Sequence, residues 1–421
     1  MQISRLLSAL FVASVCSIFA TTSAAAPTLG PQSAEDTGPF PVGVANYTFV
    51  DAGSGDTIIA TLYYPAQSAG TNAPPDSASG PYPLVGFQHG WLGTPNDYDN
   101  LSIHIASWGF FVASIGTETS FFGTMQAEAE DTGRLLREMD AQSDDGGSMW
   151  FGMISDDPWS AVGHSMGGGA CFYLLGEEPR VRVLVPLQPY TGPALGGFNG
   201  AAGLLAAFDG DLLIVGGEID STAPVATMAY PTYLGAMSTA RRVYWEVEGM
   251  GHLGPTDFPP FNEPLSNSEQ QRMHRKLVAG FLRAEVLGEE NVHVELLGEG
   301  KDDEPFERLE VIARDPIHWS AASEFSMSTL VVGIAGQPGD PAFLIASLGT
   351  SSIQTAFGLL GVDLNPGVSV ILLGAPLGAT AIQEVAVPLD SALSGVTVYT
   401  QGLDLDGSPG VLTRTAAYLV P

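Results

Sequence analysis

Ser165 lies in a glycine-rich motif whose spacing suits nucleophilic chemistry. Residues 163–167 read Gly-His-Ser-Met-Gly and fit the pattern G-x-S-x-G. In this pattern the serine occupies a strained turn between a strand and a helix, and the flanking glycines let the two elements approach closely. The apolar run 159–162 before the motif and the small-residue helical run 166–175 after it supply that context. The alternative, an incidental serine in a glycine-rich turn, is disfavoured by it.

A serine hydroxyl is a weak nucleophile until a base removes its proton, and that base needs a carboxylate to orient it. Around this type of turn the chain order is serine, then acid, then histidine. His252 follows the strand predicted at 243–247 in a short loop. Asp220 follows the strand predicted at 212–216, at the sheet edge where doubly wound folds collect their sites. We therefore predict a catalytic set of Ser165, Asp220 and His252.

Other side chains compete for these roles. Glu218 and Asp257 are rivals for the acid, and His252 as a solvated loop residue is the alternative for the base. Four aspartates precede predicted strands and should lie at the wrong edge of the sheet: Asp156, Asp157, Asp209 and Asp211. The remaining histidines lie before or beside the nucleophile, on helices, or in or near the linker: His89, His104, His164, His274, His293 and His318.

Two backbone N–H groups are expected to stabilise the negative oxygen of a tetrahedral intermediate. One belongs to Met166, directly after the nucleophile, and the other to the loop after the third strand. That strand and loop end Phe-Gln-His-Gly-Trp at residues 87–91, which makes the N–H of Trp91 the candidate. A tryptophan that merely packs at the sheet edge is the alternative.

Strands and helices alternate between residues 44 and 288. This alternation predicts an α/β fold, a doubly wound and mostly parallel sheet with helices on both faces. The expected strands are 44–50, 57–64, 82–88, 110–115, 159–163, 181–187, 212–216 and 243–247. The expected helices are 96–108, 125–141, 166–175, 225–237 and a last one that begins at a capping box of Ser266 and Glu269.

The character of the chain changes after residue 288. Residues 289–320 are charged, with one candidate strand at 308–312, and we expect a linker there. Short β-prone runs then alternate with Gly/Pro turns, which predicts a small all-β, sandwich-like domain. Those runs are 330–334, 368–373, 396–400 and 418–420. The expected organisation is a signal peptide (1–26), a catalytic domain (27–288), the linker (289–320) and a β-rich accessory domain (321–421).

The first residues have the layout of a secretory signal peptide. Arg5 precedes the apolar run 6–20 and the small residues 21–26, so we expect cleavage near residues 24–26. The run is shorter than the ~20 residues of a membrane span, and a retained N-terminal anchor is the alternative. We therefore expect a secreted, extracellular or periplasmic protein without a membrane span. Cleavage removes Cys16 and leaves Cys171 alone, so no intramolecular disulfide is expected.

Composition excludes other classes of protein. The 421 residues include 46 acidic and 15 basic side chains, for a net charge of −31. Because phosphate binding needs clustered Lys and Arg, and no such cluster exists here, a nucleic-acid partner is disfavoured. With 45% hydrophobic and only 14% charged residues, the chain is not of the disordered class. The charge indicates an acidic coat on a globular protein.

Residues from about 40 to 287 resemble the α/β-hydrolase fold, most closely the bacterial cutinase-type polyester hydrolases and the related dienelactone-hydrolase-like esterases. The shared stretches are GHSMGGG at 163–169, IDSTAPV at 219–225, EGMGH at 248–252 and ASWGFFV at 106–112. The resemblance implies a serine hydrolase that cleaves carboxylic esters through an acyl-enzyme, with neither metal nor organic cofactor. It also implies that Trp91 lends its N–H to the oxyanion hole and that Tyr190 lines the cleft.

The chain departs from that family in three respects. The oxyanion loop of the family commonly reads Pro-Gly-aromatic, whereas residues 89–91 here read His-Gly-Trp. The C-terminal disulfide of many members cannot form, and residues 321–421 lie outside the resemblance. Asp404-Leu405-Asp406-Gly407 hints at calcium but is too short for a loop ligand set, and a solvated turn is the alternative.

The expected substrate follows from the space around the site. Only about two dozen residues separate the strand that ends near Leu187 from the one that begins at Leu212, too few for a cap domain. We therefore expect an open cleft suited to bulky or polymeric esters. As a separate expectation, the protein is a monomer. A small-molecule carboxylesterase or lipase is the nearest alternative. A catalytically inactive surface or polymer-binding protein is the alternative from another class.

Overall fold

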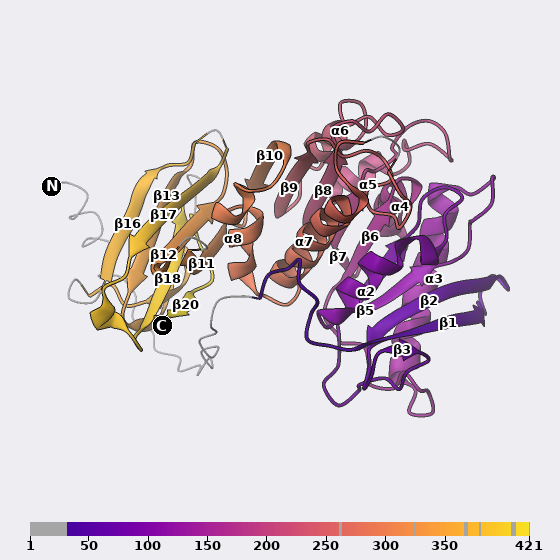
Figure 1. Cartoon of the computed structure of the whole chain (residues 1–421), viewed down its shortest axis with the longest axis horizontal. Helices are drawn as coiled ribbons and strands as arrows, with labels where there is room; N and C mark the ends of the chain where they lie inside the picture. The colour runs from indigo at the N-terminus through magenta and orange to yellow at the C-terminus, as the bar shows by residue number, and fades with distance from the viewer. Residues whose placement is uncertain are drawn as a thin grey trace.

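The computed structural model describes residues 32–260, 263–323, 326–365, 369–378, 380–405 and 410–420. The described chain forms an α/β part built on one large sheet, followed by smaller all-β sheets (Figure 1). This arrangement confirms the fold class that the alternation of strands and helices predicted. The predicted signal peptide lies outside the described residues, as do Asp406 and Gly407 of the candidate calcium turn.

The large sheet has ten strands within the described chain, in the order β10-β9-β8-β7-β6-β4-β5-β2-β1-β3. Neighbours from β9 to β5 in this order pair in parallel, whereas β2 pairs antiparallel with β5 and β1, and β10 pairs antiparallel with β9. The strands are β1 (Val42–Val50), β2 (Thr57–Pro65), β3 (Gly70–Thr71), β4 (Leu84–Gln88), β5 (Phe111–Ile115), β6 (Trp159–His164), β7 (Val181–Leu187), β8 (Asp211–Gly217), β9 (Arg241–Val247) and β10 (Phe306–Ala313).

Helices cover both faces of this sheet (Figure 1). They are the 3₁₀ turn η1 (Pro95–Tyr98), α2 (Asp99–Ser107), α3 (Met125–Asp144), α4 (Met166–Glu177), α5 (Ala202–Ala207), α6 (Ala229–Gly235) and α7 (Asn267–Glu285). The capping box predicted for the last helix is confirmed, because the hydroxyl of Ser266 accepts from Glu269 N–H and the Glu269 carboxylate accepts from Ser266 N–H.

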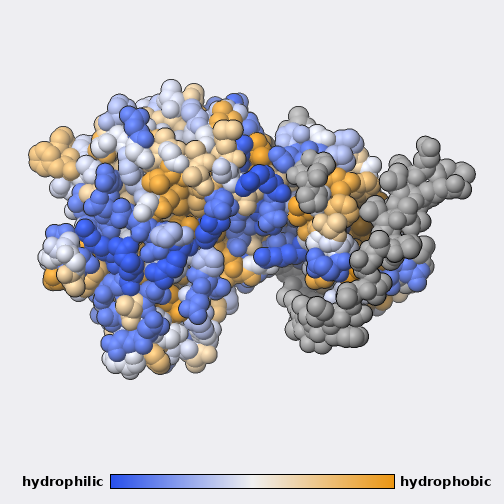
Figure 2. Space-filling model, turned by 180° about the vertical axis from the view of Figure 1, so that it is seen from behind, coloured by the Kyte–Doolittle hydropathy of each residue, from blue (hydrophilic) through white to orange (hydrophobic). Residues whose placement is uncertain are grey.

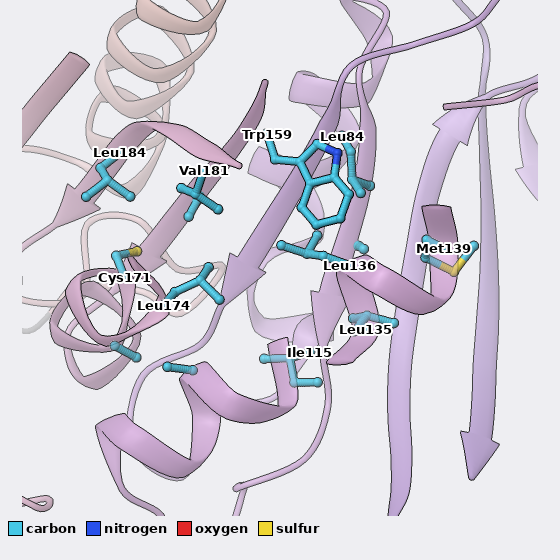
Figure 3. Packing of buried hydrophobic residues seen from close by; sticks show 14 of the residues in the cluster. Leu84, Ile115, Leu135, Leu136, Met139, Trp159, Cys171, Leu174, Val181 and Leu184 are labelled. Carbon is cyan, nitrogen blue, oxygen red and sulfur yellow. The ribbon is translucent and has the colours of Figure 1, made fainter. Parts of the chain in front are cut away.

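Alternate residues of each central strand enter opposite cores, as the pleat of a strand requires. Leu84 of β4 packs beneath α3 and α4, and its neighbour Val85 packs on the side of α2 and α7. Figure 3 shows the first core, where Leu136 of α3 lies against Trp159 of β6, and Leu174 of α4 lies on the side of Val181 of β7. Because these strands are buried on both faces and run in parallel, the loops that follow them meet at one edge of the sheet.

The segment expected as a linker, 289–320, is folded. It contains η2 (Glu290–Val292), α8 (His293–Leu296), η3 (Glu299–Lys301), the strand β10 and the start of β11 (Ile317–Ser323). The candidate strand at 308–312 is confirmed, since β10 includes it and extends the large sheet.

Several of the charges that made this segment resemble a linker are paired. The carboxylate of Glu304 lies 2.6 Å from Arg272 and 2.6 Å from Lys276 of α7. The apolar residues between these charges pack into the second core, together with Trp319 of β11. The segment therefore continues the α/β part into the β-rich part, and the domain boundaries stay a prediction.

The all-β part has two larger sheets with a common core. Their orders are β11-β12-β17 and β16-β13-β18-β19, with β20 paired to β18, and β14 pairs with β15. Val332 of β12, Leu344 of β13 and Tyr418 of β20 share the core between them. The remaining strands are β12 (Ser326–Ala335), β13 (Pro341–Ser347), β14 (Thr350–Thr355), β15 (Gly358–Val362), β16 (Ser369–Pro376), β17 (Ile382–Pro388), β18 (Thr397–Asp404), β19 (Val411–Leu412) and β20 (Ala416–Leu419), with the 3₁₀ turn η4 (Ser391–Leu393).

Hydrophilic residues cover much of the surface of the α/β part that is seen in Figure 2. None of the helices in the described residues combines the length and the apolar character that crossing a membrane requires. Cys171 is a free, buried cysteine on α4 that contributes to the first core.

His318 of β11 should make the folded protein sensitive to acid. Both ring nitrogens are buried without a hydrogen-bond partner among the described residues, and burial lowers the pKa of His318 to about 3. Because the folded pKa lies below the unfolded value of about 6.5, the stabilisation is complete above that value and is lost as the pH falls towards 3. At pH 5 the loss is about 2 kcal/mol.

We expect His318→Leu to reduce the pH dependence of stability. The difference in unfolding free energy between pH 7.5 and pH 5.0, measured by urea denaturation, should be about 2 kcal/mol smaller in the variant. An identical difference in the two proteins would show that His318 does not remain neutral in the folded state.

Candidate active site

Ser165 stands at the sharp turn between β6 and α4. Its backbone has φ 55° and ψ −114°, a left-handed conformation that is strained for a residue with a side chain. The N–H of Ser165 donates to the carbonyl of Leu187 at 3.0 Å, and its own carbonyl accepts from the N–H of Tyr190 at 2.8 Å. These two bonds to the chain around the end of β7 hold the turn in place.

The two glycines of the motif permit this turn. A Cβ on Gly163 would overlap the carbonyl oxygen of Gly167, and a Cβ on Gly167 would overlap that of Gln88 at the end of β4. Both positions therefore require glycine because a backbone carbonyl occupies the space of a side chain. The strand–turn–helix context that the motif predicted is present.

Three side chains from separate loops meet at this turn. Ser165 Oγ lies 2.9 Å from Nε2 of His252, and Nδ1 of His252 lies 2.7 Å from Oδ2 of Asp220. Asp220 follows β8 and is buried, and its other oxygen accepts from the backbone N–H groups of Thr222 at 2.8 Å and Ala223 at 2.7 Å. These bonds fix the carboxylate before it meets the imidazole.

The contacts of His252 define which ring nitrogen carries the proton. A carboxylate only accepts hydrogen bonds, so Nδ1 must donate its hydrogen to Asp220. The neutral ring then presents a lone pair at Nε2, which faces the hydroxyl of Ser165. This arrangement is suited to removing the serine proton.

The rival carboxylates make other contacts. Glu218 accepts from the N–H of Gly249 at 2.9 Å, and Asp257 accepts from the N–H of Asn100 at 3.2 Å. Both bonds stabilise loops next to the site. The four aspartates placed at the opposite edge precede β6 or lie at the start of β8: Asp156, Asp157, Asp209 and Asp211.

The other histidines are buried and, apart from His164, make their contacts away from Ser165. His89 contacts the carbonyls of Gly90 and Thr117, at 2.8 and 2.7 Å. His164 is the exception, since its ring contacts the hydroxyl of Tyr98 and the main-chain carbonyl of His252. The remaining ones are His104, His274, His293 and His318.

The loop after β4 lies directly over the nucleophile. A Cβ on Gly90 would lie 3.4 Å from Cβ of Ser165, which shows how closely the backbone approaches. The N–H of Gly167 donates to the carbonyl of His89 at 3.0 Å and so joins this loop to the first turn of α4. Trp91 belongs to the loop, and Met166 is the first residue of α4, whose N–H has no acceptor within its own helix.

Three exposed aromatic side chains, which we call the aromatic rim, come from this loop and from the loop after β5: Trp91, Phe121 and Phe122. The indole N–H of Trp91 donates to the carbonyl of Phe121 at 3.2 Å, and the two rings meet edge-on with centroids 5.1 Å apart. Phe121 and Phe122 are also edge-on, at 5.8 Å. The exposed fractions are 39% for Trp91, 66% for Phe121 and 86% for Phe122. Large apolar side chains this exposed, at the sheet edge that carries the nucleophile, are suited to contacting a ligand.

Tyr190 and the segment between β7 and β8 also border the space near the nucleophile. Tyr190, predicted to line the cleft, is half-buried, and its N–H bonds to the carbonyl of Ser165. The segment 188–210 between β7 and β8 contains only the short helix α5. No cap domain therefore interrupts the sheet at this point, as the length of the segment predicted.

Sequence reasoning missed Tyr98, His164 and the two phenylalanines of the rim. The phenylalanines had a signal, since two adjacent apolar aromatics stand in the loop after β5, at the edge that carries Ser165. Tyr98 had none, because its role depends on contacts between distant loops. Among the described residues, no group of three or more His, Cys, Asp or Glu side chains is placed to hold a metal ion.

Known proteins share this part of the chain. A protein-family model described as PET hydrolase-like matches residues 24–262, which is more than half of the 421 residues. The chain belongs to the PET hydrolase-like family. The match includes Ser165, Asp220 and His252, and it ends before the folded segment that leads to the all-β part.

Several cutinases are similar to this PET hydrolase-like protein. Cutinase 1 of Thermobifida cellulosilytica is 29% identical over 221 residues, which cover 52% of this chain and 73% of that cutinase. A cutinase of Thermobifida fusca (strain YX) is also 29% identical over 221 residues, covering 52% of this chain and 64% of that protein. A bis(hydroxyethyl) terephthalate hydrolase of Streptomyces coelicolor is 29% identical over 206 residues, covering 48% of this chain and 60% of that enzyme.

Gly167→Ala should disrupt the turn at Ser165. The new methyl group would overlap the Gln88 carbonyl, and we expect a loss of about 3 kcal/mol in unfolding free energy because a packed backbone contact cannot relax freely. Labelling of Ser165 by a fluorophosphonate should slow at the same time.

Gly203→Ala in α5 is the matched control. A Cβ there meets no atom within 4 Å, so this variant should be as stable as the parent or more stable by up to about 1 kcal/mol. Equal stability of the two variants in urea denaturation would contradict the close contact at Gly167.

Proposed function

We propose that this PET hydrolase-like protein is a serine hydrolase that cleaves carboxylic esters, with bulky or polymeric esters as its substrates. The observation that carries the proposal is the continuous hydrogen-bond sequence from Ser165 through His252 to Asp220, at 2.9 and 2.7 Å. The names of the relatives, cutinases and a bis(hydroxyethyl) terephthalate hydrolase, agree with it.

Acylation begins when Ser165 Oγ attacks the ester carbonyl carbon while Nε2 of His252 takes the hydroxyl proton. The new C–O bond converts the carbonyl into a tetrahedral oxyanion. When the oxyanion collapses, the bond to the alcohol breaks, and His252 gives its proton to the leaving oxygen. Asp220 holds the Nδ1–H throughout and stabilises the imidazolium that forms.

The oxyanion is stabilised by the backbone N–H groups of Trp91 and Met166. The N–H of Trp91 lies in the loop over Ser165, and the N–H of Met166 lies at the start of α4, where the positive end of the helix dipole also favours negative charge. Since both groups belong to a rigid backbone, little reorganisation accompanies the reaction. Loss of one such donor typically costs about 3–4 kcal/mol of transition-state stabilisation.

Deacylation repeats these steps with water. Nε2 of His252 takes one proton from a water molecule, whose oxygen forms a bond to the acyl carbon. Collapse of the second oxyanion breaks the bond to Ser165 Oγ, which regains the proton from His252. The products are the carboxylic acid and the free enzyme.

The aromatic rim supports the choice of bulky esters. Trp91, Phe121 and Phe122 offer a row of exposed rings on loops at the sheet edge that carries Ser165, and apolar or aromatic chain segments can pack against such rings. No cap domain limits access at the segment between β7 and β8. A small-molecule carboxylesterase would not need a row of exposed aromatics that continues beyond the nucleophile.

A polymeric ester would be met outside the cell, so we also propose that the chain is exported. The mature protein then begins near residues 24–26 and carries residues 321–421 as an accessory domain. N-terminal sequencing of protein secreted by the native host tests the cleavage position. Size-exclusion chromatography with light scattering tests the expectation of a monomer.

The alternative from another class, an inactive polymer-binding protein, has less support. An inactive hydrolase would be under no constraint to keep the strained Ser165 turn and the hydrogen bonds of Asp220 and His252 together. A fluorophosphonate probe distinguishes the two, because it labels Ser165 only where His252 activates it.

Removal of the nucleophile or the acid should abolish or strongly reduce activity. We expect Ser165→Ala to lose hydrolysis of p-nitrophenyl esters and Asp220→Asn to reduce kcat about 10⁴-fold, because the imidazole loses its orienting carboxylate. Asp257→Asn is the matched control and should retain parental kcat. Hydrolysis by the Ser165→Ala variant would refute the proposal. A large loss of kcat in Asp257→Asn would instead identify Asp257 as the catalytic acid.

The aromatic rim should matter most for solid substrates. We expect Phe122→Ala to reduce release of products from polyester particles at least fivefold more than it reduces hydrolysis of p-nitrophenyl acetate, because the small ester has no chain to contact the rim. Phe151→Ala, which removes another exposed phenylalanine from the loop before β6 at the opposite sheet edge, serves as control. Equal effects of the two substitutions on particles would exclude a role for the rim.

A further inference from the structure

Tyr98 and His164 are buried beside Ser165, and the steps of ester cleavage do not use them. The hydroxyl of Tyr98, at the end of η1, accepts from the N–H of Gly90 at 2.8 Å. The same hydroxyl lies 2.8 Å from Nδ1 of His164, the residue before the nucleophile. On the other side of that ring, Nε2 of His164 lies 2.8 Å from the carbonyl oxygen of His252.

The acceptors in this chain fix where each hydrogen lies. A carbonyl oxygen only accepts, so Nε2 of His164 must donate its hydrogen to His252. Burial, together with the neighbouring His252, lowers the pKa of His164 well below its usual range, so the ring is neutral and Nδ1 has a lone pair. The hydroxyl of Tyr98 therefore donates to Nδ1 while its oxygen accepts from Gly90. Every bond in the chain has one donor and one acceptor.

The chain joins three separate segments. Gly90 belongs to the loop over the nucleophile and is the residue directly before Trp91. His164 ends β6 beside Ser165, and His252 belongs to the loop after β9. The three rings are also in contact: the ring centroids of Tyr98 and His164 are 5.7 Å apart, and those of His164 and His252 are 4.9 Å apart.

We propose that Tyr98 and His164 are positioning residues, which hold the oxyanion loop and the loop of His252 at a fixed distance from Ser165. The proposal rests on the hydrolase function proposed above and concerns the same site. It assigns no contact with substrate to either side chain. Instead, the two side chains set the separation of the groups that make those contacts.

Tyr98→Phe tests this role because it removes one oxygen atom and keeps the ring. The N–H of Gly90 and Nδ1 of His164 then lose their common partner, and the tautomer of His164 is no longer fixed. A displacement of reacting groups by about 1 Å can cost about 10²-fold in rate. We expect kcat for p-nitrophenyl butyrate to fall 10- to 100-fold while KM changes less than twofold.

Tyr63→Phe is the matched control. Its buried hydroxyl donates to Asp99 at 2.5 Å and approaches the carbonyl of Pro95 at 3.3 Å, so it makes a similar number of bonds next to η1. Within the described part of the chain, this hydroxyl has no bond to the loops of the site. Both variants should show a similar decrease in Tm, but only Tyr98→Phe should lose kcat well below its Tm.

A double-mutant cycle with His164→Leu provides the second test. If the two side chains act as one chain, the double variant should have a kcat within threefold of His164→Leu alone. A kcat loss in the double variant equal to the product of the two single losses would overturn the proposal. So would a parental kcat in Tyr98→Phe, or equal kcat losses in Tyr98→Phe and Tyr63→Phe.

The two proposals fail separately. If ester hydrolysis persists in Ser165→Ala, both the proposed hydrolase function and this inference are refuted. If hydrolysis requires Ser165 but is unchanged in Tyr98→Phe, only the positioning role is refuted.

Discussion

The active site depends on the close contact of Gly167 with the end of β4, where helix α4 approaches the sheet without room for a side chain. The N–H of Gly167 bonds to the carbonyl of His89 in the same contact. Since Ser165 lies two residues before Gly167 and Trp91 two residues after His89, this one backbone interaction relates the nucleophile to the oxyanion loop. The loops that carry Asp220 and His252 then need only the ordinary register of parallel strands, because β8 and β9 end at the same edge. The strain at Ser165 is supported by this packing, and none of its stabilisation comes from a disulfide among the described residues.

A second consequence concerns charge inside the site. The buried groups around Ser165 are neutral or paired: His164 stays uncharged because of its burial, and Asp220 has two backbone N–H donors in addition to His252. Hydrogen bonds between neutral groups need little reorganisation when charge develops nearby, and they are stronger in a low-dielectric interior than in water. The net charge of −31 is therefore not concentrated in the buried groups around Ser165, and hydrophilic residues cover much of the α/β surface seen in Figure 2.

The sequence allowed good prediction of features that depend on local chemistry. The G-x-S-x-G turn, the capping box at Ser266 and the order of strands and helices all follow from patterns within a few residues, and the structure contains them. Ser165, Asp220 and His252 could be selected because each follows a predicted strand at the same edge. The contacts of Tyr98 could not be predicted, since they join loops whose separation depends on the packed sheet. The segment 289–320 was assigned as a linker because its charges are dense, and only the structure shows that Arg272 and Lys276 pair with Glu304.

The pairing of β10 with β9 determines which strand forms the edge of the large sheet. Without β10, the large sheet would end at β9, whose central residues Val243, Tyr244 and Trp245 are buried and apolar. An exposed apolar strand edge is a template for association with other chains. β10 replaces that edge with one that carries Glu307, Arg308 and Glu310, charges that discourage such pairing. β10, which lies beyond the match to the family, thus covers the apolar edge of β9, and a chain cut at residue 288 would expose that edge while one cut at residue 320 would retain β10.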